Sequence, residues 1–172
     1  MENFPLSGSK DMVWVDIGCG TARNLEYFSA ATIKKYFKKI YLVDISASLL
    51  EVASKRVELM GLQDIVEVIE CDVTSKAMFK SMPKLGTVDC VTISYALSMI
   101  PDQVACVENI TALLRPKTGW LAIADFFMKG NNDDTLPPFG RMMRKFESHC
   151  HRIWFSFDHV HLLHDKQLNF KK

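Results

Sequence analysis

The sequence predicts an α/β protein built around a doubly wound, mostly parallel sheet. Apolar runs of strand length alternate along the chain with longer stretches of helical periodicity, the pattern that builds parallel sheets from strand, helix and strand units. A glycine turn at Gly18 and Gly20 follows the first strand, and Asp44 and Asp72 follow the next two. We expect a single domain over residues 1–172, because this length is sufficient for one sizeable core but too short for two ordinary domains.

The first unit contains a strand, a helix and a second strand. Residues 12–17 form a short apolar run that stops at the glycine turn, as a buried strand does. Helical periodicity then predicts a helix over about 21–39. An apolar run at 40–43 predicts the second strand. The glycine turn therefore connects a strand to a helix.

The second unit has signals at both ends of its helix. Ser48, with Glu51 three residues later, has the spacing of a capping box and predicts where the helix begins. A helical apolar face follows, and Gly61 is placed to end the helix, because glycine readily adopts the left-handed conformation found after helix ends. An apolar run at 65–69 predicts the third strand, which stops just before Asp72.

The last two predicted strands are separated by a third helix. Residues 88–94 form the fourth apolar run, and Pro101 and Asp102 open a helix that continues to about residue 114. The strongly apolar residues 120–127 predict the fifth strand. This order of elements is that of a Rossmann-like fold.

The ends of the chain have a different composition. Residues 1–11 are expected to be a flexible N-terminus, and the turn-rich residues 129–138 a linker. Residues 139–172 begin with an amphipathic basic helix and are a candidate substrate region. This helix either packs on the domain with a solvated face, or contacts an anionic membrane surface or a lipid substrate.

Charge and cysteine content limit the classes of function. The 21 basic and 20 acidic residues nearly cancel, so we expect no binding to nucleic acid. Five scattered cysteines without CxxC spacing argue against a disulfide framework and a zinc knuckle, and they favour a reducing compartment. The sequence has neither an apolar run long enough to span a membrane nor a signal-peptide pattern, which predicts a soluble, cytoplasmic protein.

Small and acidic residues at the strand ends form the candidate binding site. Ligands of open parallel sheets lie beyond the carboxyl ends of the strands, where the strand order reverses. Gly18 and Gly20 let the backbone approach a ligand closely. Asp44 is positioned to accept hydrogen bonds from both ribose hydroxyls of an adenosine, and Asp72 can accept the adenine amino hydrogens. Asp16 adds an acid near the ligand's cationic end.

The acids favour S-adenosylmethionine as the ligand. Carboxylates attract its sulfonium and ammonium groups, whereas they repel a pyrophosphate cofactor. A nicotinamide-dependent oxidoreductase would use the same glycines and Asp44, but Asp72 argues against it. A binding protein that keeps the fold without turnover is a second alternative, which the fold alone does not distinguish from an enzyme.

Several segments resemble a known family. The string WVDIGCGTARNLEYF resembles the first motif of class I S-adenosylmethionine-dependent methyltransferases, and YLVDISASLLEVASKR resembles their second. SYALSMIPD at 94–102, DFF at 125–127 and WFSFDHVHL at 154–162 are similar to the methyltransferase half of betaine lipid synthase, which makes diacylglyceryl-N,N,N-trimethylhomoserine. The resemblance covers about residues 13–170. It implies an N-methyltransferase (class EC 2.1.1) acting on the amine of a lipid head group such as diacylglycerylhomoserine.

The resemblance also implies roles for individual residues. The cofactor-binding set is Asp16, Gly18, Gly20, Thr21, Asn24, Asp44, Ile45, Asp72, Val73 and Ser94. The catalytic candidates are Tyr95 and His159, and the substrate-binding candidates are Tyr95, Phe127, Trp154, Phe157, Asp158 and His161. Aromatic faces in the second set would stabilise a methylated, cationic product. We expect no metal, because the two histidines have no third ligand at zinc spacing.

The chain also departs from the family pattern. The family has glycine where this chain has Ala22, which would weaken cofactor binding if the backbone there needs a positive φ angle. Residues 160–172 contain no convincing candidates for the two further strands of a full sheet, so we expect the last strands to be missing, as in a fragment or a degenerate copy.

The partners are inferred from the same resemblance. It implies a separate aminocarboxypropyl transferase partner and peripheral contact with the endoplasmic reticulum membrane. A small-molecule amine remains the alternative to a lipid acceptor.

Overall fold

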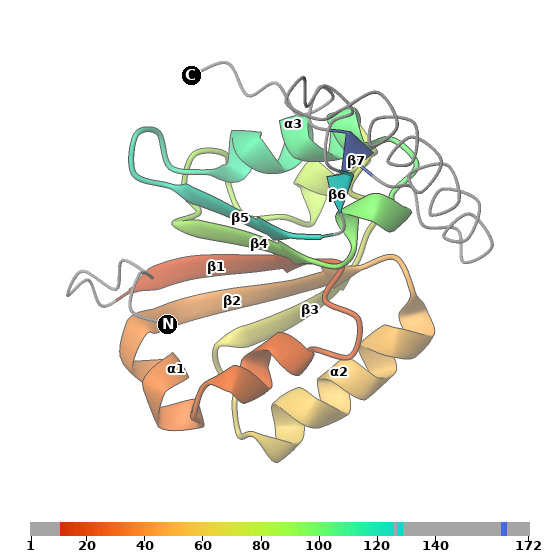
Figure 1. The fold of residues 1–172 in the computed structure, drawn as a ribbon. Coiled ribbons are helices and arrows are strands. Elements are labelled where there is room, and N and C mark those ends of the chain that lie inside the picture. Colours follow the sequence, from red (N-terminus) through yellow and green to blue (C-terminus); the bar gives the residue numbers. More distant parts are fainter. Residues whose placement is uncertain (1–10, 126, 129–162, 165–172) are drawn as a thin grey trace, which may run out of the picture.

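The computed structural model describes residues 11–125 with their side chains and the backbone of residues 127–128 and 163–164. Within this part of the chain, five parallel strands form one sheet in the order β3-β2-β1-β4-β5 (Figure 1). The strands are β1 (Met12–Ile17), β2 (Phe37–Asp44), β3 (Val66–Glu70), β4 (Cys90–Ser94) and β5 (Trp120–Ala124), with a separate pair formed by β6 (Phe127–Met128) and β7 (Leu163–His164). The strand order reverses between β1 and β4, which confirms the predicted doubly wound fold.

Helices cover both faces of the sheet (Figure 1). One face carries the 3-10 helix η1 (Arg23–Tyr27), α1 (Ala30–Tyr36) and α2 (Ala47–Leu59), and the other carries the 3-10 helices η2 (Lys76–Lys80) and η3 (Leu97–Met99) with α3 (Gln103–Leu113). Side chains of β1 alternate between the two cores: Trp14 packs in the cluster that includes Ala53, and Val15 in the cluster that includes Ile110. The central strand therefore belongs to both cores.

The single helix expected over 21–39 is wrong. The segment divides into η1 and α1, because Ser29 caps a new helix with its side chain accepting a hydrogen bond from the Thr32 N–H at 3.1 Å. β2 then begins directly at Phe37, three residues earlier than the apolar run indicates. The ring of Phe37 is buried 5.4 Å from that of Trp14, so packing extends the strand through the two lysines that follow.

The predicted capping box is also wrong. The residue that caps α2 is Ser46, two positions before Ser48, and its side chain makes no capping hydrogen bond. Asp44 explains the shift, because its carboxylate accepts from the Ser46 N–H at 2.9 Å and so fixes the backbone before the helix. Glu51 is exposed in the second turn of α2.

Two other helix ends agree with the sequence signals. Gly61 follows the last residues of α2 with φ of +64°, and its N–H donates to the Glu58 carbonyl at 2.9 Å. Asp102 caps α3, where its side chain accepts from the Ala105 N–H at 2.9 Å. The residues that stop or start these helices therefore act through local backbone chemistry, which the sequence displays.

Strand boundaries differ from the prediction by short distances. β3 lies one residue beyond the expected 65–69. β4 begins two residues after the start of the expected 88–94, and Val88 makes only an isolated bridge. The Asp89 carboxylate accepts from the Val13 N–H at 2.9 Å, so a side chain takes the place of a ladder hydrogen bond there.

The fifth strand is shorter than the expected 120–127. β5 ends at Ala124, and the carboxylate of Asp125 accepts from the Ser98 N–H at 2.9 Å. The chain then forms β6, which pairs in parallel with β7 in a separate two-stranded sheet. The expectation that residues 160–172 hold no candidates for the two further strands of a full sheet is not contradicted, because β7 does not extend the five-stranded sheet.

Several expectations concern residues outside the described ranges. These are the flexible N-terminus up to residue 10, the linker 129–138 and the amphipathic helix that follows it. In the part of the chain that is described, no helix has the length and apolar character needed to cross a membrane.

Candidate cofactor site

The predicted site residues meet at the carboxyl edge of the sheet, at the point where the strand order reverses. The glycine turn follows β1, Asp44 ends β2, Asp72 follows β3, and Ser94 ends β4. These four strands are hydrogen-bonded neighbours, so their carboxyl ends lie side by side.

The glycine turn is tightly fitted at one glycine and open at the other. Gly18 has φ of +63°, and a Cβ there would lie 2.3 Å from the Cβ of Ala96. Gly20 has φ of +52°, but a Cβ there would meet no atom within 4 Å. The space beside the Gly20 backbone is therefore open, whereas that beside Gly18 is filled by Ala96.

Asp44 holds the glycine turn in place. One carboxylate oxygen accepts from the Gly20 N–H at 2.8 Å, and the other accepts from the Ser46 N–H at 2.9 Å. A carboxylate has about four acceptor positions, so the two hydrogen bonds leave capacity for ribose hydroxyls. Ile45 follows with 69% of its surface exposed, which places an apolar side chain beside the Asp44 carboxylate.

Asp16 lies beneath the turn and is fully buried. It accepts hydrogen bonds from Thr92 Oγ1 at 2.6 Å and from Asn24 Nδ2 at 3.0 and 3.1 Å, while the indole N–H of Trp14 donates to Thr92 Oγ1 at 2.7 Å. Burial raises the pKa of Asp16 to about 6, against the opposing effect of the hydrogen bonds. The buried carboxylate of Asp16 thus connects β1, η1 and β4.

Thr92 and Trp14 were not among the predicted site residues. A signal for Thr92 exists, because it is a polar residue in an apolar strand, but its partner follows only from the register, which sets Asp16 opposite Thr92.

Arg56 is a third residue of the site that was not among the predicted site residues. It extends from α2, where its Nη1 donates to the Thr21 carbonyl and to Thr21 Oγ1, and its Nε pairs with Glu26 at 3.0 Å. The backbone at Ala22, next to Thr21, is left-handed with φ of 61°, which is the condition under which alanine was expected to be unfavourable. Arg56 therefore anchors the glycine turn beside its strained residue. No pattern in the sequence connects Arg56 to this turn.

Asp72 is exposed, unlike Asp16. Its Oδ1 accepts from the N–H of Thr74 at 2.9 Å and from its hydroxyl at 2.7 Å, and these bonds lower the pKa of Asp72. The carboxylate is therefore ionised at neutral pH. Val73 follows with its side chain buried in the core cluster.

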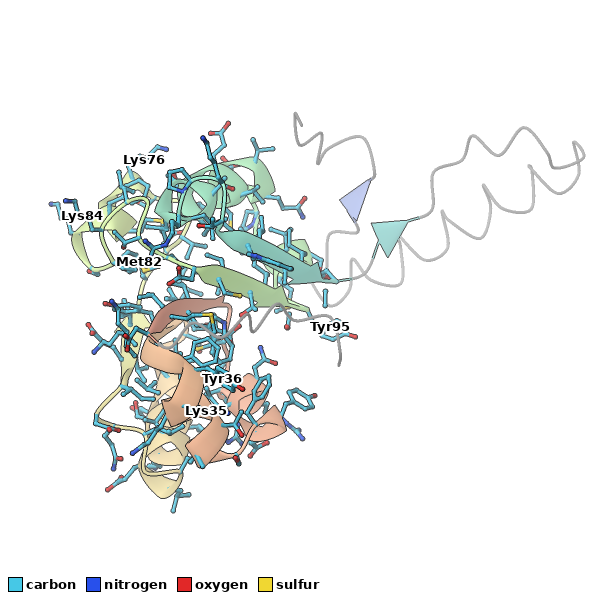
Figure 2. The ribbon with its side chains drawn as sticks, turned by 90° about the vertical axis from the view of Figure 1, so that its left-hand side faces the viewer. Lys35, Tyr36, Lys76, Met82, Lys84 and Tyr95 are labelled. Carbon is cyan, nitrogen blue, oxygen red and sulfur yellow. The ribbon has the colours of Figure 1, made fainter. Side chains whose placement is uncertain are left out.

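Tyr95 follows Ser94 at the end of β4 in a left-handed conformation, with φ of 53°. Its N–H donates to the Ala124 carbonyl at 2.7 Å, and 61% of its surface is exposed. Figure 2 shows Tyr95 beyond the carboxyl ends of β4 and β5. Non-glycine residues in this conformation are strained and cluster at functional sites, and the role predicted for Tyr95 stays a prediction.

The remaining predicted site residues are not described. Phe127 has only its backbone described, in β6. The others lie outside the described ranges: Trp154, Phe157, Asp158, His159 and His161. Among the described side chains, no group of three or more histidine, cysteine or acidic residues could hold a metal ion.

A protein-family comparison decides the identity of the fold. Residues 8–167 match the model of a methyltransferase domain, which covers nearly the whole chain. The chain belongs to this methyltransferase domain family. A comparison with curated proteins finds no match.

Solved structures agree with this methyltransferase fold. A SAM-dependent methyltransferase from Aquifex aeolicus superposes with a TM-score of 0.56 at 24% identity, over 77% of this chain and 65% of that protein. YcgJ from Bacillus subtilis superposes with a TM-score of 0.60 at 21% identity, over 83% of this chain and 52% of that protein. StiE O-MT superposes with a TM-score of 0.60 at 27% identity, over 74% of this chain and 41% of that protein. The methyltransferase chain therefore spans between 41% and 65% of the length of these three relatives.

The described residues fit the cofactor that this family uses, S-adenosylmethionine. The open backbone of Gly20 and the acceptors of Asp44 suit an adenosine, and the carboxylates of Asp44 and Asp72 at one sheet edge suit a ligand that carries a sulfonium and an ammonium group. Membership of the methyltransferase family also favours this cofactor over the nicotinamide alternative.

Proposed function

We propose that this methyltransferase domain transfers methyl groups to the amine of a lipid head group such as diacylglycerylhomoserine. The observation that carries the proposal is the position of Tyr95, which is strained, exposed and on the same sheet edge as Asp44 and Asp72. The segment around it, SYALSMIPD, also resembles the methyltransferase half of betaine lipid synthase. A small-molecule amine is the alternative acceptor.

The cofactor contacts follow from the strand ends. Asp44 would accept the ribose hydroxyls while it holds the Gly20 N–H, and Ile45 would lie against the adenine. Asp72 would accept the adenine amino hydrogens beside the Val73 backbone. Ser94 completes the set at the end of β4.

The chemistry requires positioning more than acid or base catalysis. When bound, S-adenosylmethionine supplies a methyl group that is already electrophilic. The chain must hold a neutral amine in line with the carbon–sulfur bond, and such alignment can supply several kcal/mol. An alkylammonium has a pKa of about 10, so apolar surroundings that favour the neutral amine would assist. Tyr95 offers an aromatic face that stabilises the growing positive charge by roughly 0.5 to 2 kcal/mol.

The C-terminal region completes this proposal. The basic amphipathic helix after residue 138 would bring the domain to an anionic membrane surface, on the cytoplasmic side of the endoplasmic reticulum. An aminocarboxypropyl transferase partner would supply the head group. The acceptor contacts proposed there are Phe127, Trp154, Phe157, Asp158 and His161, with His159 as proton acceptor.

A non-catalytic role is the second candidate, and one observation favours it. Ala22 occupies a left-handed position in the cofactor turn, where glycine would be unstrained. Because strain at this position is expected to weaken cofactor binding, a domain of this kind would keep the methyltransferase fold without turnover.

Isothermal titration with S-adenosylhomocysteine tests the cofactor site. We expect binding by the intact chain and its loss in Asp44→Ala, because that variant removes both the ribose acceptor and the bond to Gly20. Asp64→Ala is the matched control, since Asp64 forms a surface ion pair with exposed Lys34 at 3.2 Å and should leave binding unchanged. Failure of the intact chain to bind would contradict the enzyme proposal.

A methyl-transfer assay then distinguishes the acceptors. Diacylglycerylhomoserine in mixed micelles should be methylated faster than free homoserine by the chain that binds cofactor. Equal rates would favour a small-molecule acceptor. Binding without transfer to either compound would favour the non-catalytic role.

A further inference from the structure

Asn109 is a polar residue on the buried face of α3. It is fully buried, and its neighbours on this face at helical spacing, Cys106 and Leu113, are ordinary core residues. Asparagine is a poor helix former, and a buried amide is normally retained only with its hydrogen bonds satisfied. An apolar residue would serve α3 better, so the reason for Asn109 must lie in its partners.

Within the described residues, the side chain of Asn109 bonds to the loop between β3 and η2 and to the first residue of η2. Its Nδ2 donates to the carbonyls of Val73 at 3.0 Å and Thr74 at 3.1 Å, and its Oδ1 accepts from Lys76 Nζ at 2.6 Å. Lys76, the first residue of η2, is labelled in Figure 2. One buried amide therefore fixes consecutive peptide units of the segment that begins at Asp72.

Thr74 connects this anchor to the proposed adenine contact. Its carbonyl is held by Asn109, while its N–H and hydroxyl both donate to the Asp72 carboxylate. Without the Asn109 amide, the carbonyls of Val73 and Thr74 would turn toward other donors. Rotation of these peptide units would move the Thr74 N–H and with it the Asp72 carboxylate.

We propose that Asn109 is a positioning residue for adenine recognition, which holds the loop 72–76 in the shape that presents Asp72 and the Val73 backbone to the base. This inference rests on the proposed adenine contact of Asp72. Asn109 itself lies behind the loop and does not touch the ligand.

The test compares two ligands that differ at the adenine amino group. Isothermal titration of the full chain is carried out with S-adenosylhomocysteine and with S-inosylhomocysteine, in which oxygen replaces that group. The affinity ratio is the affinity for S-adenosylhomocysteine divided by that for S-inosylhomocysteine. In Asn109→Leu we expect the ratio to fall about fivefold, the equivalent of roughly one hydrogen bond. If the leucine variant does not fold, Asn109→Ser takes its place in the test, because it retains a polar group in a smaller side chain. We expect the affinity ratio to fall in that variant too.

Controls separate positioning from general destabilisation. Ile110→Ala, in the same helix and core, should lower the melting temperature but leave the affinity ratio unchanged. The proposal is overturned if the affinity ratio is unchanged in every Asn109 variant that folds, because the affinities for both ligands then fall equally.

A third variant distinguishes this inference from the one on which it rests. Asp72→Ala should lower the same ratio. If it does not, or if the intact chain does not distinguish the ligands, the adenine contact at Asp72 is wrong. If Asp72→Ala lowers the ratio and the Asn109 variants do not, only the positioning role fails.

Discussion

Strain and burial at single residues mark the carboxyl edge of the sheet. Tyr95 adopts a left-handed conformation although it is not glycine, and Asp16 keeps a carboxyl group away from water. Each arrangement costs stability that a simpler residue would recover. Natural proteins tolerate such costs mainly at functional positions, so both residues lead to measurable trade-offs.

Replacing Tyr95 with glycine should make the fold more stable and slow the methyl transfer that we propose. Glycine relieves the left-handed strain of roughly 1 to 2 kcal/mol, and part of this gain is lost to its greater freedom in the unfolded chain. We expect a net gain of about 0.5 to 1 kcal/mol in urea unfolding. Methyl transfer should fall, whereas S-adenosylhomocysteine affinity should not change. A loss of stability would show that contacts of the ring outweigh the strain.

Asp16 should make stability depend on pH. Its folded-state pKa of about 6 is raised above the ordinary value of 3.8, so the folded protein binds more protons between these pH values. The free energy of unfolding should therefore fall as pH rises from about 4 to about 6, by up to roughly 3 kcal/mol. Asp16→Asn should lack this component, which urea titrations of both proteins across that range would measure. Parallel pH curves for the two proteins would contradict the assignment.

At the level of elements, side chains from the neighbouring helices and strands hold the loops of the site. Arg56 in α2 holds the glycine turn, Asn109 in α3 holds the loop after β3, and Asp44 ties β2 to the turn. The sheet aligns the strand ends, and these side chains set the shape of the loops between them. Substitutions in the helices should therefore affect binding at the carboxyl edge.

Arg56→Met should weaken cofactor binding without removing the fold. The variant keeps the apolar stem of the side chain but loses its donors to Thr21 and its pairing with Glu26. We expect an affinity loss of about five- to tenfold for S-adenosylhomocysteine, the effect of roughly 1 to 1.4 kcal/mol. Lys55→Met on the same helix is the control, since Lys55 is exposed. Equal titration curves for both variants would show that the turn holds its shape without Arg56.

The sequence predicts the features that depend on local chemistry. The apolar runs locate all five strands of the main sheet, and Gly18, Gly61 and Asp102 mark real turns and helix ends. Asp44 and Asp72 lie at the predicted edge for the same reason, because parallel strands align their carboxyl ends.

The failures have a different cause. The break at Ser29 is a capping choice inside a continuous helical pattern, and the start of β2 at Phe37 follows from its packing against Trp14. Arg56 and Asn109 act through partners about 35 residues away in the sequence, a relation that periodicity does not contain. Tertiary contacts, which a single sequence does not display, decide these features.

In the molecule as a whole, β1 connects two hydrophobic cores. Trp14 contributes to the core under α1 and α2, and Val15 to the core under α3. A shared central strand should make the two cores unfold together, because neither core is complete without β1.

Truncations in both cores test this cooperativity. Ile40→Ala and Ile110→Ala each remove a fully buried side chain, one from each core, and should each cost about 2 to 5 kcal/mol. In urea unfolding, tryptophan fluorescence and circular dichroism should report the same midpoint for each variant. Separate midpoints in either variant would show that the two cores unfold independently.

The close approach of Gly18 to Ala96 has a consequence for how this sequence can change over evolution. A Cβ at position 18 would collide with the side chain at position 96, so the turn on the cofactor side and the residue next to Tyr95 share one small space. A larger residue at 96 would displace the cofactor turn, which means that new acceptor preferences cannot arise there without an effect on cofactor affinity. Adaptation to a new acceptor is therefore directed away from position 96, toward neighbouring positions whose side chains are exposed.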